Sequence, residues 1–283
     1  MHQGQLECPY HGWRFDGEGH CRAVPGLCDE PSDQPARRAG PYALRETQGL
    51  IWVWGTPDEN PVREPHHLPF LGAPGYSCVI ESFEVEATVH ALAENTLDVP
   101  HTAFLHGGLF RKPGKVSEIE VEIYRGDEFV EARFIGEDRP EGLIGRLLAP
   151  GGGEVEHTDR FWLPSICEVD YRLSERSHIN VRSLITPLSP QRSRLTAVLC
   201  LKLPIPGWVL KPLVQPIARK IFAQDIEILS AQSESIERFG GERYVSTPID
   251  ALGPEILRLM RRAERGDRSP RDKEFVRRFR LAL

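Results

Sequence analysis

Residues 94–106 read Glu-Asn-Thr-Leu-Asp-Val-Pro-His-Thr-Ala-Phe-Leu-His. Two histidines, His101 and His106, lie five residues apart, and the first follows an aspartate by three residues and an asparagine by six. Because residues three apart share one face of a helix, Asn95, Asp98 and His101 are expected to point into one cavity. Imidazole and carboxylate groups gathered in a cavity are typical metal ligands, so this segment predicts a metal site.

A bend in this segment is expected at Pro100. We predict a helix over residues 89–106, and an interval of five residues overshoots one face of an ideal helix. Proline removes a backbone hydrogen bond and bends a helix locally, which helps to explain how His106 returns to the face of His101. Two imidazoles still need a carboxylate to complete a 2-His-1-carboxylate triad, the arrangement that leaves iron positions open for dioxygen.

The missing carboxylate is expected in a second helix, over residues 209–239. Asp225 there shares a helical face with an apolar stripe made of Ile221, Phe222, Ile228 and Leu229, which ends at Gln232. Glu227 and Glu234 fall about half a turn away, towards solvent. A carboxylate on an apolar face is costly to bury unless it is paired or binds a metal, so Asp225 is the candidate ligand. A partner for a buried arginine is the alternative role for this aspartate.

A second motif stands near the start of the chain, where residues 6–16 read Leu-Glu-Cys-Pro-Tyr-His-Gly-Trp-Arg-Phe-Asp. Cys8 and His11 are separated by two residues and followed by aromatic residues and turn glycines. This string resembles the second ligand loop of a Rieske domain. The pattern Asn-x2-Asp-x2-His-x4-His over residues 95–106 and the acidic, apolar segment beginning at Asp225 resemble the catalytic domain of Rieske-type non-haem iron oxygenases.

The resemblance implies two cofactors. In that family two cysteines hold one iron of a [2Fe–2S] cluster and two histidines hold the other. By resemblance, Cys8 and His11 each supply one ligand to the cluster. A mononuclear Fe(II) is then held by three ligands, which are His101, His106 and Asp225.

The resemblance also gives roles to Asp98 and Asn95. The aspartate at this position in the family connects an iron ligand to a cluster histidine of the neighbouring subunit in a homotrimer. Asp98 is therefore expected to bond His101 and to face His11 of another subunit, and Asn95 is expected to support the same cavity.

Half of the cluster site is missing from the printed sequence. The other two ligands belong, in the family, to a Cys-x-His loop upstream, but seven residues precede Cys8 and none is a cysteine. No later cysteine has a histidine two positions on. We expect a truncated gene or a start assigned too late. A zinc site is the alternative, with ligands drawn from Cys8, His11, His20 or Cys21, and Cys28.

The spacing of apolar residues predicts an α+β fold. Period-two patterns predict strands over residues 50–54, 76–87, 117–124, 128–135, 160–171, 179–188 and 195–203. A further helix is expected over residues 248–264, and strands in sequence with inserted and appended helices indicate an antiparallel sheet. The resemblance implies a partial all-β Rieske domain at residues 1–56 and a helix-grip catalytic domain at 76–265. The proline-rich residues 57–75 are expected to form a linker, and the basic residues 266–283 a tail.

Bulk composition excludes several classes of protein. A net charge of −6 and a pI near 6.0 leave no basic surplus for nucleic acid. No apolar run reaches the length of about 18 residues that a membrane helix needs. The first residues do not resemble a signal peptide, and six dispersed cysteines do not make a disulfide scaffold. We therefore expect a cytoplasmic protein.

The activity implied by the resemblance is reductive activation of dioxygen. A flavin reductase, alone or through a ferredoxin, would supply electrons for monooxygenation or dioxygenation of an aromatic or other hydrophobic small molecule. The layout resembles the monooxygenase and O-demethylase branch. Inward side chains of the sheet are expected to line the pocket, with Phe161, Leu163, Ile166 and Leu184 as candidates. His157 and His178 are expected at strand edges.

Two other functions remain open. The first is a carrier of hydrophobic ligands on the same helix-grip scaffold, which would keep the cavity but need no iron. The second is an inactive truncated oxygenase that binds iron and receives no electrons.

Overall fold

A computed structural model describes residues 1, 3–106, 118–137, 155–174, 176–267, 269 and 272–282. The chain divides into two compact units, Met1–Leu68 and Pro69–Leu283. The boundary between them lies inside the proline-rich segment 57–75, and each unit is described by itself. No helix in the described part of the chain is long and apolar enough to cross a membrane.

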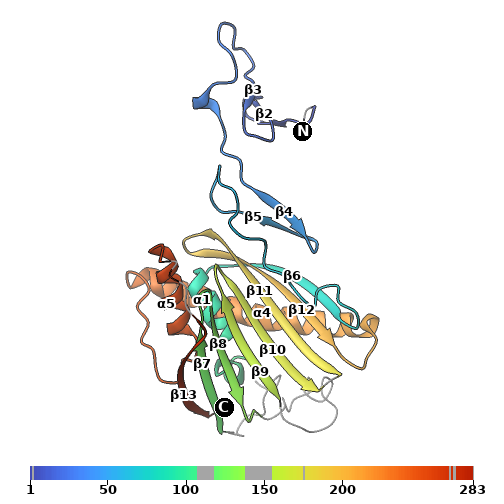
Figure 1. Ribbon diagram of the computed structural model, residues 1–283, viewed down its shortest axis with the longest axis vertical. Coiled ribbons are helices and arrows are strands. Elements are labelled where there is room, and N and C mark those ends of the chain that lie inside the picture. The colour runs from blue at the N-terminus through green and yellow to red at the C-terminus, as the bar shows by residue number, and fades with distance from the viewer. Residues whose placement is uncertain are drawn as a thin grey trace. The chain divides into compact units, whose positions relative to one another are not determined.

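The smaller unit is built from short strands (Figure 1). A three-stranded antiparallel sheet contains β1 (Leu6–Glu7), β2 (Arg14–Phe15) and β3 (Cys21–Ala23), and a 3-10 turn follows at Pro35–Arg37. The second element is a hairpin of β4 (Leu44–Thr47) and β5 (Leu50–Val53). Its two turn residues, Gln48 and Gly49, both have positive φ, which is the backbone geometry of the tightest hairpin turn.

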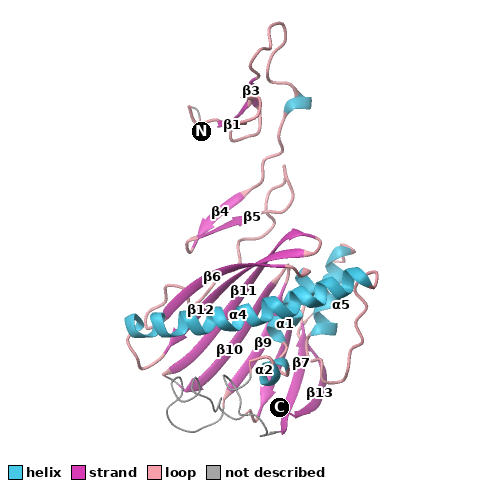
Figure 2. Cartoon of the chain, turned by 180° about the vertical axis from the view of Figure 1, so that it is seen from behind, coloured by secondary structure: helices cyan, strands magenta, loops and turns pink. Residues whose placement is uncertain are grey.

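The larger unit contains one eight-stranded antiparallel sheet in the order β13-β7-β8-β9-β10-β11-β12-β6. The strands are β6 (Ser77–Val85), β7 (Glu118–Arg125), β8 (Phe129–Ile135), β9 (Glu156–Trp162), β10 (Ile166–Ser174), β11 (Ser177–Ser189), β12 (Arg192–Lys202) and β13 (Glu274–Ala282). The helices are α1 (Val89–Leu97), α2 (His101–Phe104), α4 (Gly207–Arg238) and α5 (Gly253–Glu264). Figure 2 shows α4 crossing one face of this sheet, with α1 on the same face.

The hydrophobic core lies between the sheet and the helices. Phe161 on β9 stands opposite Val130 on β8 and Cys167 on β10, so the three side chains share one face. They are fully buried together with Leu92 of α1 and Leu229 of α4. Burial of apolar surface is the main stabilising contribution to such a layer, and it fixes the sheet against the helices. The expected helix-grip arrangement is confirmed in its sheet and helices.

One predicted strand is two strands in the structure. The sequence predicts a single strand over residues 160–171, whereas β9 ends at Trp162 and β10 begins at Ile166, which pairs back with it. Pro164 lies between them and has no backbone N–H to donate to a ladder. The proline therefore ends the first strand, and the chain reverses into a hairpin.

The basic C-terminal segment also differs from its prediction as a tail. Within it, β13 pairs antiparallel with β7 at the edge of the sheet. Leu281 is buried. Arg278 and Arg280 stand opposite Glu122 and Glu120 on β7. Arg278 forms an ion pair with Glu122. The period-two alternation of apolar and basic residues thus matches a strand whose charges face an acidic neighbour.

Two of the cysteines form a disulfide. Cys78 on β6 and Cys200 on β12 stand opposite each other and are bonded, and the other four cysteines are free. The bond joins two strands that the sheet already pairs.

The sheet face opposite the helices carries a buried ion cluster around Glu131. The side chain of this residue is 3% exposed. Its carboxylate accepts from Arg160 Nε at 2.6 Å, from Arg133 Nε at 2.7 Å and from Lys273 Nζ at 2.7 Å. Burial would raise the pKa of Glu131, but Lys273 and Arg160 outweigh it and lower the pKa from 4.5 to about 2. Because Lys273 precedes β13, the cluster also fastens the C-terminal segment.

We expect this cluster to make stability depend on acid pH. A carboxylate with a lowered pKa in the folded state stabilises the protein above the unfolded pKa and loses that effect as the pH falls through the folded pKa. The pKa of Glu131 therefore contributes about 3 kcal/mol at pH 7, lost between roughly pH 5 and pH 2. Urea unfolding of the wild type and of Glu131→Gln should show a stability difference that shrinks over this range. The control is Glu227→Gln, at an exposed position on α4. A difference that stays constant with pH would contradict the assignment.

Candidate metal centre

The histidine-bearing segment is two helices, not the single bent helix that the sequence predicts. Thr88 begins α1 by accepting a hydrogen bond from the N–H of Ala91. The helix ends at Asp98, whose backbone is extended with φ −87° and ψ 104°. The residue before a proline is disfavoured in the helical region, and Pro100 lacks an N–H, so the chain leaves the helix here and restarts as α2. The two histidines are therefore brought together by the break between α1 and α2, and not by their spacing along one helix.

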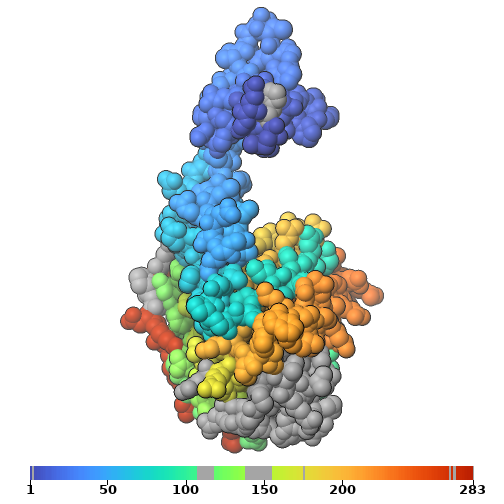
Figure 3. All heavy atoms as spheres, turned by 90° about the vertical axis from the view of Figure 1, so that its right-hand side faces the viewer, coloured from blue at the N-terminus to red at the C-terminus, as the bar shows by residue number. Residues whose placement is uncertain are grey.

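Asp225 lies on the sheet-facing side of α4. The buried residues of this helix recur at intervals of three and four, as one helix face requires, and include Ala218, Leu229, Ser233 and Ile236. Asp225 falls on this face, and its side chain is 14% exposed. The predicted stripe is wrong at two positions, because Ile228 is 51% exposed and Gln232 is exposed. Both lie one position away from the buried residues Leu229 and Ser233. Figure 3 shows atoms of α4, in orange, on the surface of the molecule.

The structure brings the three predicted metal ligands together. His101, His106 and Asp225 offer one ligand atom each, and these atoms lie within 4.8 Å of one another. Oδ1 of Asp225 is 3.2 Å from Nε2 of His106 and 3.5 Å from Nε2 of His101. This oxygen is buried and has no hydrogen-bond partner among the described residues. A buried carboxylate oxygen without a hydrogen bond, facing two imidazole nitrogens, fits a cation held by all three groups.

The charges of the site favour a cation. Burial would lower the pKa of His101, but the carboxylates of Asp225 and Asp98 outweigh it and raise the pKa to about 9. Burial would likewise raise the pKa of Asp225, but the two imidazoles hold it below its usual value. The pocket therefore stabilises positive charge between its carboxylate and its imidazoles.

Each imidazole uses its Nδ1 atom for a protein partner. Nδ1 of His101 bonds the backbone carbonyl of Asp98 and lies 3.4 Å from the Asp98 carboxylate, which also accepts from the His101 N–H at 3.2 Å. Nδ1 of His106 lies 3.0 Å from Oε1 of Gln224. An imidazole that donates from Nδ1 has its lone pair on Nε2, so both rings turn their ligating nitrogen towards Asp225.

The two neighbouring candidates differ in their contacts. Asp98 contacts His101 through both its backbone and its carboxylate. Asn95 is half-buried, and within the described residues its side chain makes no hydrogen bond, although its backbone carbonyl accepts from the N–H of Asp98. Gln224 was not a candidate from the sequence, because nothing in its local pattern relates it to a histidine 118 residues away.

Comparison with known proteins gives the family. The vanillate O-demethylase oxygenase C-terminal domain matches residues 85–266, which is more than half of the chain. The chain belongs to this family. A Rieske [2Fe–2S] domain matches residues 1–32. These matches confirm the resemblance to Rieske-type oxygenases of the demethylase branch.

Curated relatives of this vanillate O-demethylase oxygenase family member include plant and bacterial proteins. Flavonoid 8-hydroxylase 2 of Ocimum basilicum is 31% identical over 46% of this chain and 27% of its own length. The oxygenase component of dicamba O-demethylase of Stenotrophomonas maltophilia is 29% identical over 54% of this chain and 45% of its own length. The chain thus spans less than half of these relatives.

Solved structures share the fold of this family member. Dicamba monooxygenase bound to dicamba has a TM-score of 0.73 at 19% identity, over 94% of this chain and 81% of that one. NdmA of Pseudomonas putida CBB5 with caffeine has a TM-score of 0.73 at 20% identity, over 96% and 78%. At this identity the likeness concerns the fold alone.

The Rieske-like loop of the smaller unit forms a tight turn. The N–H of Gly12 donates to the Cys8 carbonyl at 2.9 Å, and the N–H of Cys8 donates to the Trp13 carbonyl at 2.8 Å. Cys8 is a free, half-buried thiol, and His11 is exposed with its ring against Tyr10. In the part of the chain that the structure describes, these residues do not join His20, Cys21 or Cys28 in a group of metal ligands. The zinc alternative therefore has no support from the described residues.

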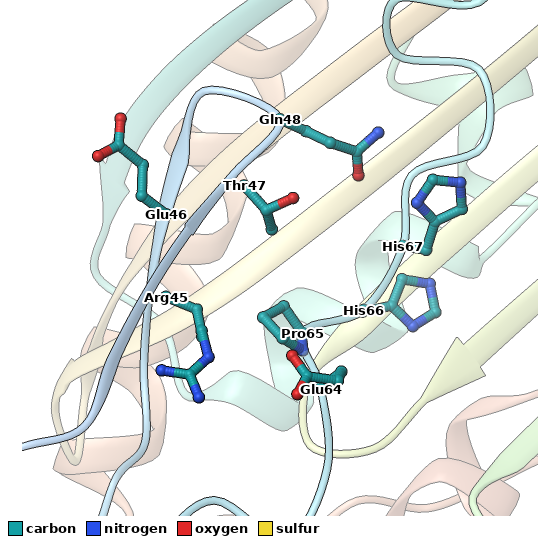
Figure 4. A pocket seen from close by; sticks show the side chains of 8 residues that line it. All are labelled: Arg45, Glu46, Thr47, Gln48, Glu64, Pro65, His66 and His67. Atoms are coloured by element: carbon teal, nitrogen blue, oxygen red, sulfur yellow. The ribbon is translucent and has the colours of Figure 1, made fainter.

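A polar pocket of about 170 Å³ also lies in the smaller unit. Figure 4 shows its lining side chains, which come from the β4–β5 hairpin and the segment after it: Arg45, Glu46, Thr47, Gln48, Glu64, Pro65, His66 and His67. The amide of Gln48 makes two hydrogen bonds to the backbone of Leu68, at 2.8 and 2.9 Å. These bonds tie the hairpin turn to the end of the unit.

Two histidines expected at strand edges are buried. His157 lies inside β9 between Glu137, at 2.6 Å from Nδ1, and Asp159, at 2.9 Å from Nε2. Its ring is stacked between Phe134 and Tyr171. Burial would lower the pKa of His157, but the two carboxylates outweigh it and raise the pKa to about 9. The alternation of His157, Asp159 and a phenylalanine in one strand was the signal that could have placed this side chain inside.

His178 is buried on the other face of the sheet. Its Nε2 lies 2.9 Å from Asp170 and its Nδ1 lies 2.6 Å from the Tyr76 hydroxyl. Both nitrogens are thus occupied by protein groups.

The four residues expected to line the pocket lie on both faces of the sheet. Phe161 and Leu163 belong to the core that faces the helices. Ile166 and Leu184 pair with each other one position out of step with Cys167, so they lie on the opposite face of the sheet. Because side chains alternate along a strand, Ile166, next to Cys167, and Leu184, opposite Ile166, both point away from the helix-facing side.

We expect the purified protein to bind one divalent metal ion per chain at the triad. A ligand at about 100 times its Kd adds about 2.7 kcal/mol to folding stability, so Fe(II) or Co(II) should raise the melting temperature. Asp225→Asn and His106→Ala should remove this rise, measured by calorimetry, and the bound metal, measured by elemental analysis. Glu227→Gln, exposed on the same helix, is the control. Retention of the metal-dependent rise in Asp225→Asn would rule out the site.

Proposed function

We propose that this chain is the oxygenase component of a Rieske-type hydroxylating or demethylating system. The observation that carries the proposal is the buried Oδ1 of Asp225, which has no hydrogen bond and faces the Nε2 atoms of His101 and His106. Membership of the vanillate O-demethylase oxygenase family supports the same activity. The three residues would hold a mononuclear Fe(II).

The metal ligands, Asp98 and the apolar core have separate roles in the proposed site. When bound, Fe(II) supplies the one-electron chemistry that activates dioxygen. His101, His106 and Asp225 would hold the ion as a set of two imidazoles and one carboxylate. Asp98 holds the His101 ring through Nδ1 and so keeps its Nε2 aimed at Asp225. The apolar core beside the site excludes water from its inner wall.

Electron supply is the second part of the proposal. A ferredoxin or a flavin reductase would donate electrons, and the chain would act as a homotrimer in which Asp98 faces His11 of a neighbouring subunit. Within the printed sequence Cys8 and His11 match one ligand loop of a [2Fe–2S] cluster, and a second Cys-x-His loop does not occur. Two of the four ligands do not complete a cluster, so we assign no step to one.

The substrate class follows from the relatives. Their names include demethylases of dicamba and of methylxanthine and a flavonoid hydroxylase, which all act on aromatic molecules. We propose an aromatic or similar hydrophobic substrate. For a methyl ether the balance is one substrate, one dioxygen, two electrons and two protons, giving the hydroxyl compound, formaldehyde and water.

The proposal is tested by formaldehyde release from aromatic methyl ethers. With Fe(II), dioxygen, NADH and a ferredoxin–reductase pair, the wild type should release formaldehyde in proportion to product. Asp225→Asn should reduce the rate by more than about 100-fold, because loss of a group that only supports a metal ligand already costs about 10–100-fold in activity. Glu227→Gln should release formaldehyde at the rate of the wild type. Iron and acid-labile sulfide are measured on the same sample.

The outcomes separate the alternatives. A protein that binds aromatic ligands equally well with and without iron, and never releases product, would be a carrier. A protein that binds one iron, contains no sulfide and releases no product even when a donor pair is present would be an oxygenase chain without an electron supply.

A further inference from the structure

The two histidine rings of the metal centre are oriented by hydrogen bonds to different parts of the chain. His101 is held locally, because its Nδ1 bonds the carbonyl of Asp98, three residues earlier. His106 is held from a distance, because its Nδ1 bonds the side chain of Gln224 on α4. The side chain of His106 is 2% exposed, so its ring depends on protein groups and not on solvent for a partner.

One helix therefore contacts both nitrogens of the same ring. Oε1 of Gln224 lies 3.0 Å from Nδ1 of His106, and Oδ1 of the next residue, Asp225, lies 3.2 Å from Nε2. Adjacent residues on a helix point about 100° apart, so their side chains can approach the ring from two sides. The angle of the His106 ring relative to the carboxylate of Asp225 is thus set within α4.

We propose that Gln224 is the positioning residue of the metal centre, which selects the tautomer of His106 that can bind a metal. The inference rests on the metal site proposed above and extends it to a residue outside the triad. With the amide oxygen towards His106, the ring carries its hydrogen on Nδ1 and keeps the Nε2 lone pair for the metal.

The chemistry of an amide makes this selection specific. A glutamine can present either an oxygen or an NH2 group. The NH2 group would require a lone pair on Nδ1 of His106, which places the hydrogen on Nε2 and removes that nitrogen as a ligand. An acceptor at position 224 is therefore what the site needs, and a carboxylate would also provide it.

The test compares an acceptor with an isostere that lacks one. Gln224→Met and Gln224→Leu remove the acceptor and keep a helix-forming side chain, whereas Gln224→Glu keeps an acceptor. Gln232→Met, at an exposed position on the same helix, is the matched control. Each metal-free protein is titrated with Co(II), and the Kd, the visible absorption bands and the melting temperature before metal addition are measured.

We expect both acceptor-free variants to bind Co(II) about 10–100-fold more weakly, with shifted absorption bands, as for other partners of metal-bound histidines. Gln224→Glu and Gln232→Met should bind Co(II) with a Kd close to that of the wild type. The melting temperature of the metal-free protein identifies any variant that fails to fold, and the remaining variant then decides.

The other outcomes distinguish the two levels of the proposal. A wild type that binds no Co(II) would overturn the metal site itself. A wild type that binds Co(II), with Gln224→Met equal to it in Kd and absorption bands, would overturn the role of Gln224 alone. Equal weakening in Gln224→Glu and Gln224→Met would also overturn it, since packing and not an acceptor would then be the cause.

Discussion

The burial of one carboxylate oxygen between two imidazoles is the constraint on which the larger unit depends. Oδ1 of Asp225 is buried without a hydrogen bond, which is costly unless positive charge lies beside it. Its two neighbours come from a segment more than a hundred residues earlier, so α2 and α4 must meet on one side of the sheet. The apolar core between the sheet and the helices holds these elements in place. The free energy gained by packing the apolar core thus offsets the cost of burying the Asp225 carboxylate.

The sequence predicts most of this arrangement where the signal is local. His101, His106 and Asp225 follow from short spacings and one amphipathic helix, and most strands follow from period-two patterns. The break between α1 and α2 was not predicted in its form, although Pro100 marks its position. The helix stops at Asp98, whose backbone is extended, two residues before Pro100. Propensity alone does not say whether a proline bends a helix or ends it.

The remaining errors come from partners that are distant in sequence. The arginines of β13 favour an exposed tail when the sequence is considered alone, because charged residues are usually solvated. Their acidic partners lie on β7, about 150 residues earlier. Gln224 was overlooked for the same reason, since its partner His106 is 118 residues away. The faces of Ile166 and Leu184 depend on the pairing of β10 with β11, which places Cys167 opposite Ser183 on the helix-facing side and turns Ile166 and Leu184 the other way.

A comparison of two buried histidine sites explains why one is a candidate metal centre and the other is not. His157 also lies between carboxylates, but Glu137 and Asp159 occupy both of its nitrogens and two aromatic rings cover both of its faces. Nothing remains on that ring for a ligand. In the metal centre each imidazole bonds a protein acceptor through Nδ1, and both Nε2 atoms face Oδ1 of Asp225, which has no hydrogen-bond partner among the described residues. Burial and carboxylate neighbours are common to both sites, so the convergence of two imidazole Nε2 atoms on one carboxylate oxygen is the property that separates a binding site from a structural one.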